Sequence, residues 1–314
     1  MNGKIKGTIC GILAAVFYGT NPLGAINLYR DGLTANSVLV YRFGIAAIIL
    51  GVILAAQRKS FAVSRHELKI LACLGVLMGL SSSSLYISFN YMDVGIASTL
   101  LFVYPIMVAV IMATMFHEKI TATTVISIAL CICGILMLNR TSDGASLSAI
   151  GVALVMVSSL TYAVYIVIVN KSTLRMSSIK LTFYVLLFGV LTILALNTAM
   201  GESTQALTTV GQWIYALQLA VVPTVLSLIL MVVAVHNIGS TPTAIMGAIE
   251  PITAVAIGVL LFGESFTPQL ALGIVLILSA VLLIICGKNL TAHKITTFIN
   301  SFGHRIAKTW RWKS

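Results

Sequence analysis

The chain has 314 residues, of which 59% are hydrophobic and only 9% are charged. Soluble domains average roughly 45–50% apolar and about 25% charged residues, so this composition excludes a soluble domain and predicts a polytopic membrane protein. The formal net charge of +11 requires no nucleic-acid partner, because a membrane topology accounts for the basic residues.

Apolar runs long enough to span a bilayer occur ten times along the chain. The links between them are short and leave no room for a soluble domain. The first run is too long for the core of a signal peptide, so we expect it to be retained as the first helix. The predicted helices cover approximately residues 8–28, 35–56, 68–90, 94–115, 121–139, 147–169, 179–198, 212–236, 241–262 and 268–287.

Basic residues are distributed unequally between the two sides of this predicted topology. With the N-terminus inside, sixteen of the nineteen Lys and Arg residues fall in inner segments, and only Arg30 and Arg140 fall in outer loops. This positive-inside bias predicts a multi-pass protein of the cytoplasmic (inner) membrane with both termini cytoplasmic. Residues 288–314 then form a basic cytoplasmic tail.

One sequence motif, a proline followed by a glutamate after an apolar run, occurs twice. Pro105 precedes Glu118 by 13 residues, and Pro251 precedes Glu264 by the same spacing, with an offset of 146 between the copies. Five helices per copy is an odd number, so the two halves have opposite orientations in the membrane. We therefore predict an all-α membrane protein with ten transmembrane helices in two inverted repeats, residues 7–139 and 148–287.

Four segments carry a resemblance to a known family. They are AAVFYGTNPLGA, Tyr41-Arg42-Phe43, the stretch from Gly95 through Ala97, Leu100 and Pro105 to Glu118, and its repeat from Gly239 through Pro251 to Glu264. Together they resemble the EamA-type transporters of the drug/metabolite transporter superfamily. The resemblance implies ten helices around a central cavity and movement of small organic solutes, often outward. It leaves the substrate open among amino acids, other metabolites, sugars and drugs.

Two charged residues, Arg42 and Glu250, fall inside predicted helices. A charge at the membrane centre costs about 2.5–3.5 kcal/mol on insertion scales, so each needs a partner or a wet cavity. Glu250 is interpreted as a ligand for a substrate amine or as a proton-coupling site; the alternatives are a neutral carboxyl and a salt bridge to Arg42. Arg42 either pairs with Glu250 or a substrate carboxylate, or extends its long side chain to the membrane surface.

Polar and aromatic side chains on the predicted helix faces are further candidates for substrate contact. Tyrosine offers an amphipathic solute both a ring and a hydroxyl, although such residues also form hydrogen bonds between helices. The candidates are Tyr18 and Asn21, Tyr86 and Asn90 on a shared face, Tyr104 before the proline, and Tyr162 and Tyr165 in register with Ser158.

The repeated prolines and glutamates suggest different roles. Pro105 and Pro251 each remove a helical hydrogen bond and are predicted to bend their helices, as candidate hinges. The freed carbonyls either face the cavity or bond to neighbouring helices. Glu118 and Glu264 lie at helix ends before threonines and are interpreted as turn residues near the start of the next helix.

Other patterns indicate packing rather than chemistry. Small residues at spacing four, from Gly7 through Gly11 and Ala15 to Gly19, predict a close helix contact. The five cysteines lie in apolar runs and are expected to be buried and reduced. No histidine accompanies them, so we predict no metal and no cofactor.

The preferred function is therefore a secondary transporter that works by alternating access and exports a small organic metabolite that is amino acid-like or drug-like. Its partners are that solute, the lipid bilayer and, as a hypothesis, protons. A polytopic membrane enzyme is the alternative, but the histidines are scattered and no catalytic motif occurs. A channel is a third class, and no pore loop is evident. No Walker A sequence is present, so ATP does not drive the chain directly.

Overall fold

The computed structural model describes residues 3–117, 122–138, 148–172, 174 and 176–287, and all regular structure within these ranges is helical. Nine helical segments there are long and apolar enough to cross a membrane, and Ala122–Met137 is a shorter apolar helix. The predicted all-α membrane fold with ten spans is confirmed. Glu118 and the tail 288–314 lie outside the described residues.

The spans differ in continuity, and their ends agree with the predicted ranges within a few residues. Six are single helices: α3 (Ala35–Ala56), α4 (Arg65–Ser88), α7 (Ala122–Leu138), α8 (Ala149–Lys171), α9 (Ser178–Ala199) and α14 (Pro268–Gly287). Four are interrupted: α1 (Gly3–Gly19) and α2 (Asn21–Arg30); α5 (Val94–Leu101) and α6 (Tyr104–Met115); α10 (Val210–Ala220), the π-helix η1 (Val221–Leu226) and α11 (Ser227–Ile238); and α12 (Ser240–Gly247) and α13 (Ile249–Phe262).

A proline lies at each interruption, where it removes one main-chain donor. Pro105 and Pro251 lie in the first turns of α6 and α13, so the predicted bends are confirmed as breaks. Pro22 and Pro223 produce the other two interruptions, which the continuous ranges 8–28 and 212–236 did not anticipate.

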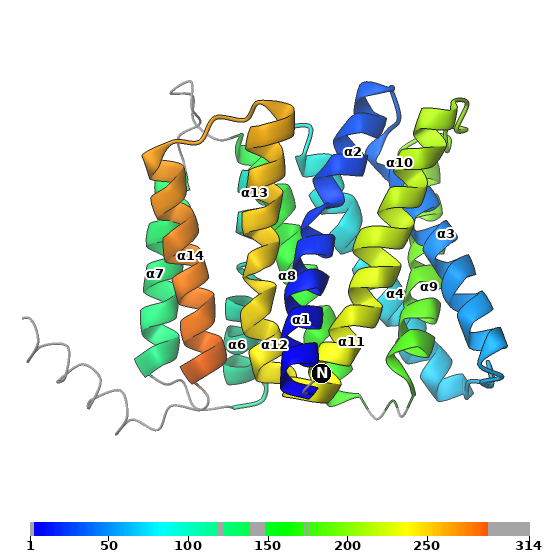
Figure 1. Ribbon diagram of the computed structural model, residues 1–314, viewed down its shortest axis with the longest axis horizontal. Coiled ribbons are helices and arrows are strands. Elements are labelled where there is room, and N and C mark those ends of the chain that lie inside the picture. Colours follow the sequence, from blue (N-terminus) through cyan, green and yellow to red (C-terminus); the bar gives the residue numbers. More distant parts are fainter. Residues whose placement is uncertain (1–2, 118–121, 139–147, 173, 175, 288–314) are drawn as a thin grey trace, which may run out of the picture.

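The packing of the helices follows the inverted duplication. α1 packs on α11, and its counterpart α8 packs on α4, which corresponds to α10–α11. α3 packs on α9, α5 on α13 and α7 on α14, each pair joining equivalent spans of the two halves. Figure 1 shows the resulting array, with α7 and α14 together at one side.

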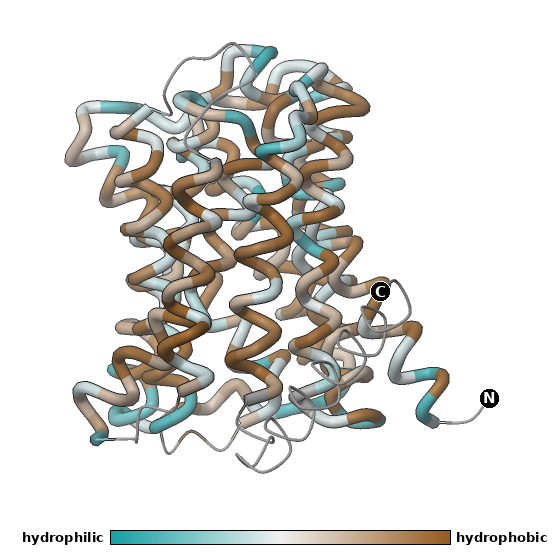
Figure 2. Tube along the Cα trace, turned by 90° about the vertical axis from the view of Figure 1, so that its left-hand side faces the viewer, coloured by the Kyte–Doolittle hydropathy of each residue, from teal (hydrophilic) through white to brown (hydrophobic). Residues whose placement is uncertain are grey.

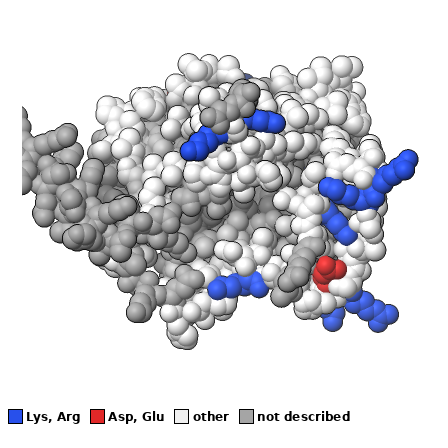
Figure 3. Space-filling model, turned by 60° about the horizontal axis from the view of Figure 1, so that its bottom comes forward, with Lys and Arg blue, Asp and Glu red and all other residues white. Residues whose placement is uncertain are grey.

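The two ends of the helix array differ in charge. Residues near one end include Lys4, Arg58, Lys59, Arg65 and Lys180, and Figure 3 shows basic side chains around that face. We call this end, at the bottom of Figure 1, the basic end. Between the two ends the chain is mainly apolar (Figure 2), as a bilayer requires.

The small-residue stripe of α1 makes the close contact expected of it. Gly7, Gly11, Ala15 and Gly19 are all buried. A Cβ built on Gly7 would lie 2.7 Å from Ile238, so only glycine allows α11 to approach this closely. The cysteine expectation was wrong in part: Cys131 is buried, but Cys73 and Cys133 are exposed on the apolar helix surface.

Candidate functional site

Arg42 lies on α3 with only 5% of its surface exposed. Its Nε donates to Thr224 Oγ1 at 3.0 Å, and its NH1 group donates to the Tyr86 hydroxyl at 2.9 Å. The rings of Tyr18, Phe43 and Tyr86 have their centroids 5.9, 5.6 and 5.5 Å from the guanidinium carbon. Arg42 is thus held inside the protein and does not extend to the membrane surface.

The partner of Arg42 on η1 depends on the break at Pro223. This proline leaves the Leu219 carbonyl without its usual helical donor, and the Thr224 hydroxyl donates to that carbonyl at 2.9 Å. The same oxygen accepts the hydrogen bond from Arg42. The Thr224 hydroxyl therefore has two roles: it bonds the carbonyl that the proline leaves free, and it orients the guanidinium of Arg42.

Asn21 and Tyr86 belong to the same hydrogen-bonded network as Arg42. Pro22 frees the carbonyl of Tyr18, to which Asn21 Nδ2 donates at 2.8 Å. Tyr86, fully buried, donates from its hydroxyl to Asn21 Oδ1 at 3.3 Å and accepts from Arg42. These two side chains position Arg42 and the break between α1 and α2.

Asn90 is not brought to this network. The sequence placed it on one helix face with Tyr86, but α4 ends at Ser88 and Asn90 lies exposed in the following turn. Helical register therefore does not continue to Asn90, and the shared face predicted for the two residues was wrong.

Glu250 lies in the first turn of α13, directly after the break at Ala248, and its side chain is half-buried. The break between α1 and α2 packs closely against the main chain at Glu250, because a Cβ on Gly19 would lie 2.7 Å from the Glu250 carbonyl oxygen. Glu250 interacts electrostatically with Arg42, but no ion pair joins the two side chains. The salt bridge considered from the sequence is therefore absent between these two described residues.

Three tyrosines form a wall of rings beside Glu250. Tyr104 packs edge-on against Tyr162 with centroids 4.7 Å apart, and Tyr162 stacks on Tyr165 at 5.7 Å. Tyr104 and Tyr162 both lie near Glu250. All three side chains are half-buried, and Tyr104 packs against the hydrophobic core.

The freed carbonyl beneath Pro105 is bonded to a neighbouring helix. The buried hydroxyl of Ser159 on α8 donates to the Leu101 carbonyl at 3.1 Å. The sequence left two alternatives for this carbonyl, facing the cavity or bonding to a neighbouring helix, and the bond to a neighbouring helix is the one observed.

Glu264 has a partner that the sequence interpretation missed. Its carboxylate accepts from the amides of Val94 at 2.7 Å and Gly95 at 3.2 Å, 170 and 169 residues away. It thus caps α5 of the opposite repeat, not the helix that follows it. Spacing along the chain could not reveal this contact, because the residues meet only when the two repeats pack.

The structure adds Thr224, Ser159 and Gly19 to the residues that shape the site. A proline inside an apolar run is the sequence signal that could have located the first two, since a freed carbonyl calls for a nearby hydroxyl. Among the described residues no group of three or more His, Cys, Asp or Glu side chains could hold a metal ion.

The sequence matches the EamA-like transporter family over residues 5–140 and 149–286. An uncharacterized transporter of Archaeoglobus fulgidus is 26% identical over 273 residues, covering 87% of this chain and 93% of the relative. One from Clostridium kluyveri is 23% identical, covering 87% and 91%. The uncharacterized transporter YetK of Bacillus subtilis is 24% identical, covering 79% and 77%.

A solved structure titled only as the crystal structure of a protein shares this fold. It superposes with a TM-score of 0.64 at 14% sequence identity, covering 89% of this chain and 96% of the other. At this identity the likeness concerns the fold alone.

Proposed function

Since the chain belongs to the EamA-like transporter family, we propose that it is a secondary transporter that moves a small amino acid-like solute by alternating access. That the protein is a multi-pass membrane transporter follows from the family and its apolar helices. The solute, the mechanism and the direction are the proposal.

The pairing state of Arg42 and Glu250 is the observation that carries the solute class. Opposite charges inside a membrane normally pair with each other, yet here Arg42 is held by neutral groups and Glu250 forms no ion pair with it. A solute with a carboxylate and an ammonium group would complement both. Tyr18 lies between the two charges, since its ring faces Arg42 and it lies near Glu250.

The tyrosine wall supplies a place for the rest of such a solute. Tyr104, Tyr162 and Tyr165 present ring faces and edges beside Glu250, which suits an apolar or aromatic side chain. Tyr86 and Asn21 act in this proposal by holding Arg42, and Asn90 is left out of the contact set.

The contacts between the broken spans support the proposed alternating access. α5 packs against α13 at the end opposite the basic end, whereas α6 and α12, the halves nearer the basic end, show no packing of comparable extent among the described residues. Inversion of the repeats makes these two pairs equivalent, so exchanging one contact for the other opens the site to the other side. Pro105 and Pro251 are the proposed hinges of this exchange.

Orientation and coupling complete the proposal. The basic end is assigned to the cytoplasm by the positive-inside rule, so in this proposal the less closely packed end faces inward. Export is proposed from the family resemblance alone, because alternating access runs in either direction. Protonation of Glu250 is the proposed means by which a proton gradient would drive the solute.

Counterflow in proteoliposomes tests the solute class. The panel consists of amino acids, amines without a carboxylate, carboxylates without an amine, and sugars. We expect amino acids to exchange best, and Arg42→Met and Glu250→Gln each to reduce exchange about tenfold or more, as loss of one charged contact implies. Arg30→Met, at an exposed arginine outside this site, is the control. Equal exchange of sugars, or full activity of both variants, would reject the proposal.

A second measurement addresses coupling. Uptake with and without a pH gradient is compared between the wild type and Glu250→Gln. If the variant responds to the gradient as the wild type does, Glu250 does not couple protons to transport.

A further inference from the structure

The contact between Glu264 and α5 joins the two repeats at the end opposite the basic end. Glu264 follows α13, and its carboxylate accepts from the first two amides of α5 at 2.7 and 3.2 Å. The N-cap residue of α5, Asp93, provides no side-chain cap of its own. Unpaired amides at a helix start favour a negative charge, and here the opposite repeat supplies it.

Glycines on both sides leave the space that this carboxylate occupies. A Cβ on Gly258 would lie 2.0 Å from Glu264 Oε2, and one on Gly95 would lie 3.1 Å from the same oxygen. Gly263 has a φ of 73°, which allows the chain to turn so that the Glu264 amide donates to the Gly258 carbonyl at 3.0 Å. The side chain is thereby folded back over the end of α13 toward α5.

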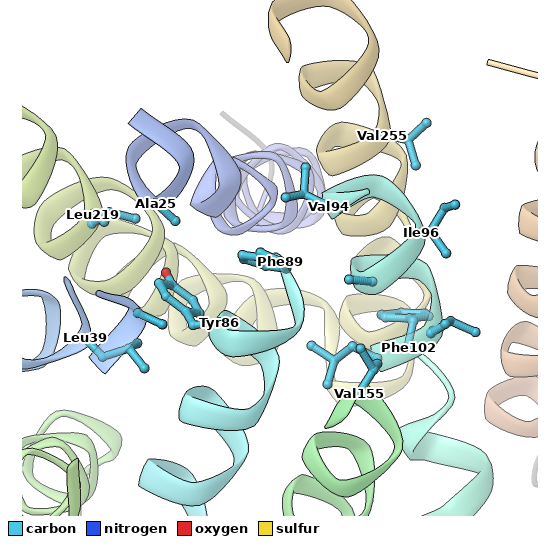
Figure 4. Packing of buried hydrophobic residues seen from close by; sticks show 14 of the residues in the cluster. Ala25, Leu39, Tyr86, Phe89, Val94, Ile96, Phe102, Val155, Leu219 and Val255 are labelled. Atoms are coloured by element: carbon cyan, nitrogen blue, oxygen red, sulfur yellow. The ribbon is translucent and has the colours of Figure 1, made fainter. Parts of the chain in front are cut away.

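The same two helices pack against each other at this end of the molecule. Figure 4 shows Val94 and Ile96 on α5 near Val255 on α13. Val255 is 5% exposed and Val94 is 2% exposed. Among the described residues α6 and α12 show no packing of comparable extent, so the carboxylate bridges the two repeats where their broken spans pack closely.

We propose that Glu264 is a latch: its carboxylate holds α13 to the start of α5 and must release those amides before the protein opens at the end opposite the basic end. The inference rests on the proposed alternating access, to which it adds the residue that controls one gate. It involves no contact with the transported solute.

Cysteine accessibility tests the latch without any solute. Val255→Cys places a thiol within the α5–α13 contact, and a membrane-impermeant thiol reagent is added to the side opposite the basic end. Peptide mass spectrometry then counts the reagent on that cysteine alone, separately from the native cysteines. We expect Glu264→Ala to raise the labelling rate about 5- to 30-fold, the range expected for loss of a helix cap.

Two further variants separate the latch from a general loss of structure. Glu264→Gln keeps one acceptor oxygen and is expected to label more slowly than Glu264→Ala. Gly258→Ala keeps the carboxylate but fills its space, so it is expected to raise labelling as Glu264→Ala does. Glu202→Ala, which removes an exposed glutamate at the same end, is expected to leave the rate unchanged.

Unchanged labelling in both Glu264→Ala and Gly258→Ala would overturn the latch, because α13 would then hold α5 without the carboxylate. This outcome leaves the transport proposal standing. Conversely, failure of counterflow would reject the proposed solute and not the measured gate.

Discussion

Ser81 and Ser158 exchange hydrogen bonds across the contact of α4 with α8. Ser81 Oγ donates to the Ser158 carbonyl at 2.9 Å, and Ser158 Oγ donates to the Ser81 carbonyl at 2.7 Å. In the other half, Ser227 Oγ donates to the Ala14 carbonyl at 2.8 Å. Ser227 follows Ser81 by 146 positions, the spacing of the repeated prolines. The inverted duplication therefore extends to single hydrogen bonds, and one half has an additional one.

We predict that Ser158→Ala, which makes this contact resemble its counterpart at Ala14, lowers stability by about 0.5–1.5 kcal/mol. The loss arises because one buried hydrogen bond disappears while the Ser81 bond remains. Thermal unfolding of the purified protein measures it. Ser82→Ala is the control, since the only hydrogen bond of that hydroxyl to a described residue is the weak one to Met78 Sδ at 3.9 Å. An equal loss in both variants would contradict the prediction.

Replacement of Thr224 by valine is expected to cost about 1–3 kcal/mol of stability, because it leaves the Leu219 carbonyl and Arg42 Nε without a partner. Thr224→Ser retains the hydroxyl and should stay close to the wild type. If Thr224 positions Arg42, the valine variant also raises the KM in counterflow of a transported amino acid. A stability loss with unchanged KM would reduce its role to helix structure.

Gly19 and Gly44 should respond to alanine in opposite directions. A Cβ at Gly19 would lie 2.6 Å from Thr253 Cβ and 2.7 Å from the Glu250 carbonyl, whereas a Cβ at Gly44 meets nothing within 4 Å. Gly19→Ala is therefore expected to destabilise by about 1–3 kcal/mol through overpacking. Gly44→Ala should stabilise by about 0.4–1 kcal/mol, because the unfolded chain loses freedom. Thermal unfolding compares them, and a stable Gly19→Ala would show that the two breaks are not in close contact.

The latch should close more firmly in acid. Burial raises the pKa of the Glu264 carboxyl, and Asp93 adds to this, while the Val94 and Gly95 amides oppose it. Arg30 lies over the ring of Phe262, at the end of α13. An open latch places the carboxyl in water at its ordinary pKa, so the closed state binds the proton more tightly. Closure is thus favoured as the pH falls through the raised pKa and weakened as the pH rises above it.

Labelling of Val255→Cys across a pH series measures this dependence. Dividing each rate by that of the same cysteine in the Glu264→Gln background removes the effect of pH on the thiol itself. The ratio is expected to fall as the pH is lowered. A ratio that rises in acid would mean that the ionised carboxylate holds the latch better than the protonated one.

The sequence alone determined the spans, their number and their inverted order. Apolar length and the distribution of charge act locally along a helix, and a bilayer leaves the main chain few alternatives to helix. The bends at Pro105 and Pro251 followed in the same way. Pro22 and Pro223 carried the same signal, and their breaks could have been predicted from it.

Only the tertiary structure decided which polar groups meet. The apolar runs place Arg42 and Glu250 within membrane spans, but whether the two side chains pair depends on the distance between helices of opposite repeats. Three other features depend equally on how those helices pack: Glu264 caps α5, Thr224 bonds to Arg42, and Asn90 lies away from the site. Such contacts join residues more than 160 positions apart or depend on where a helix ends, and neither apolar periodicity nor charge placement encodes them.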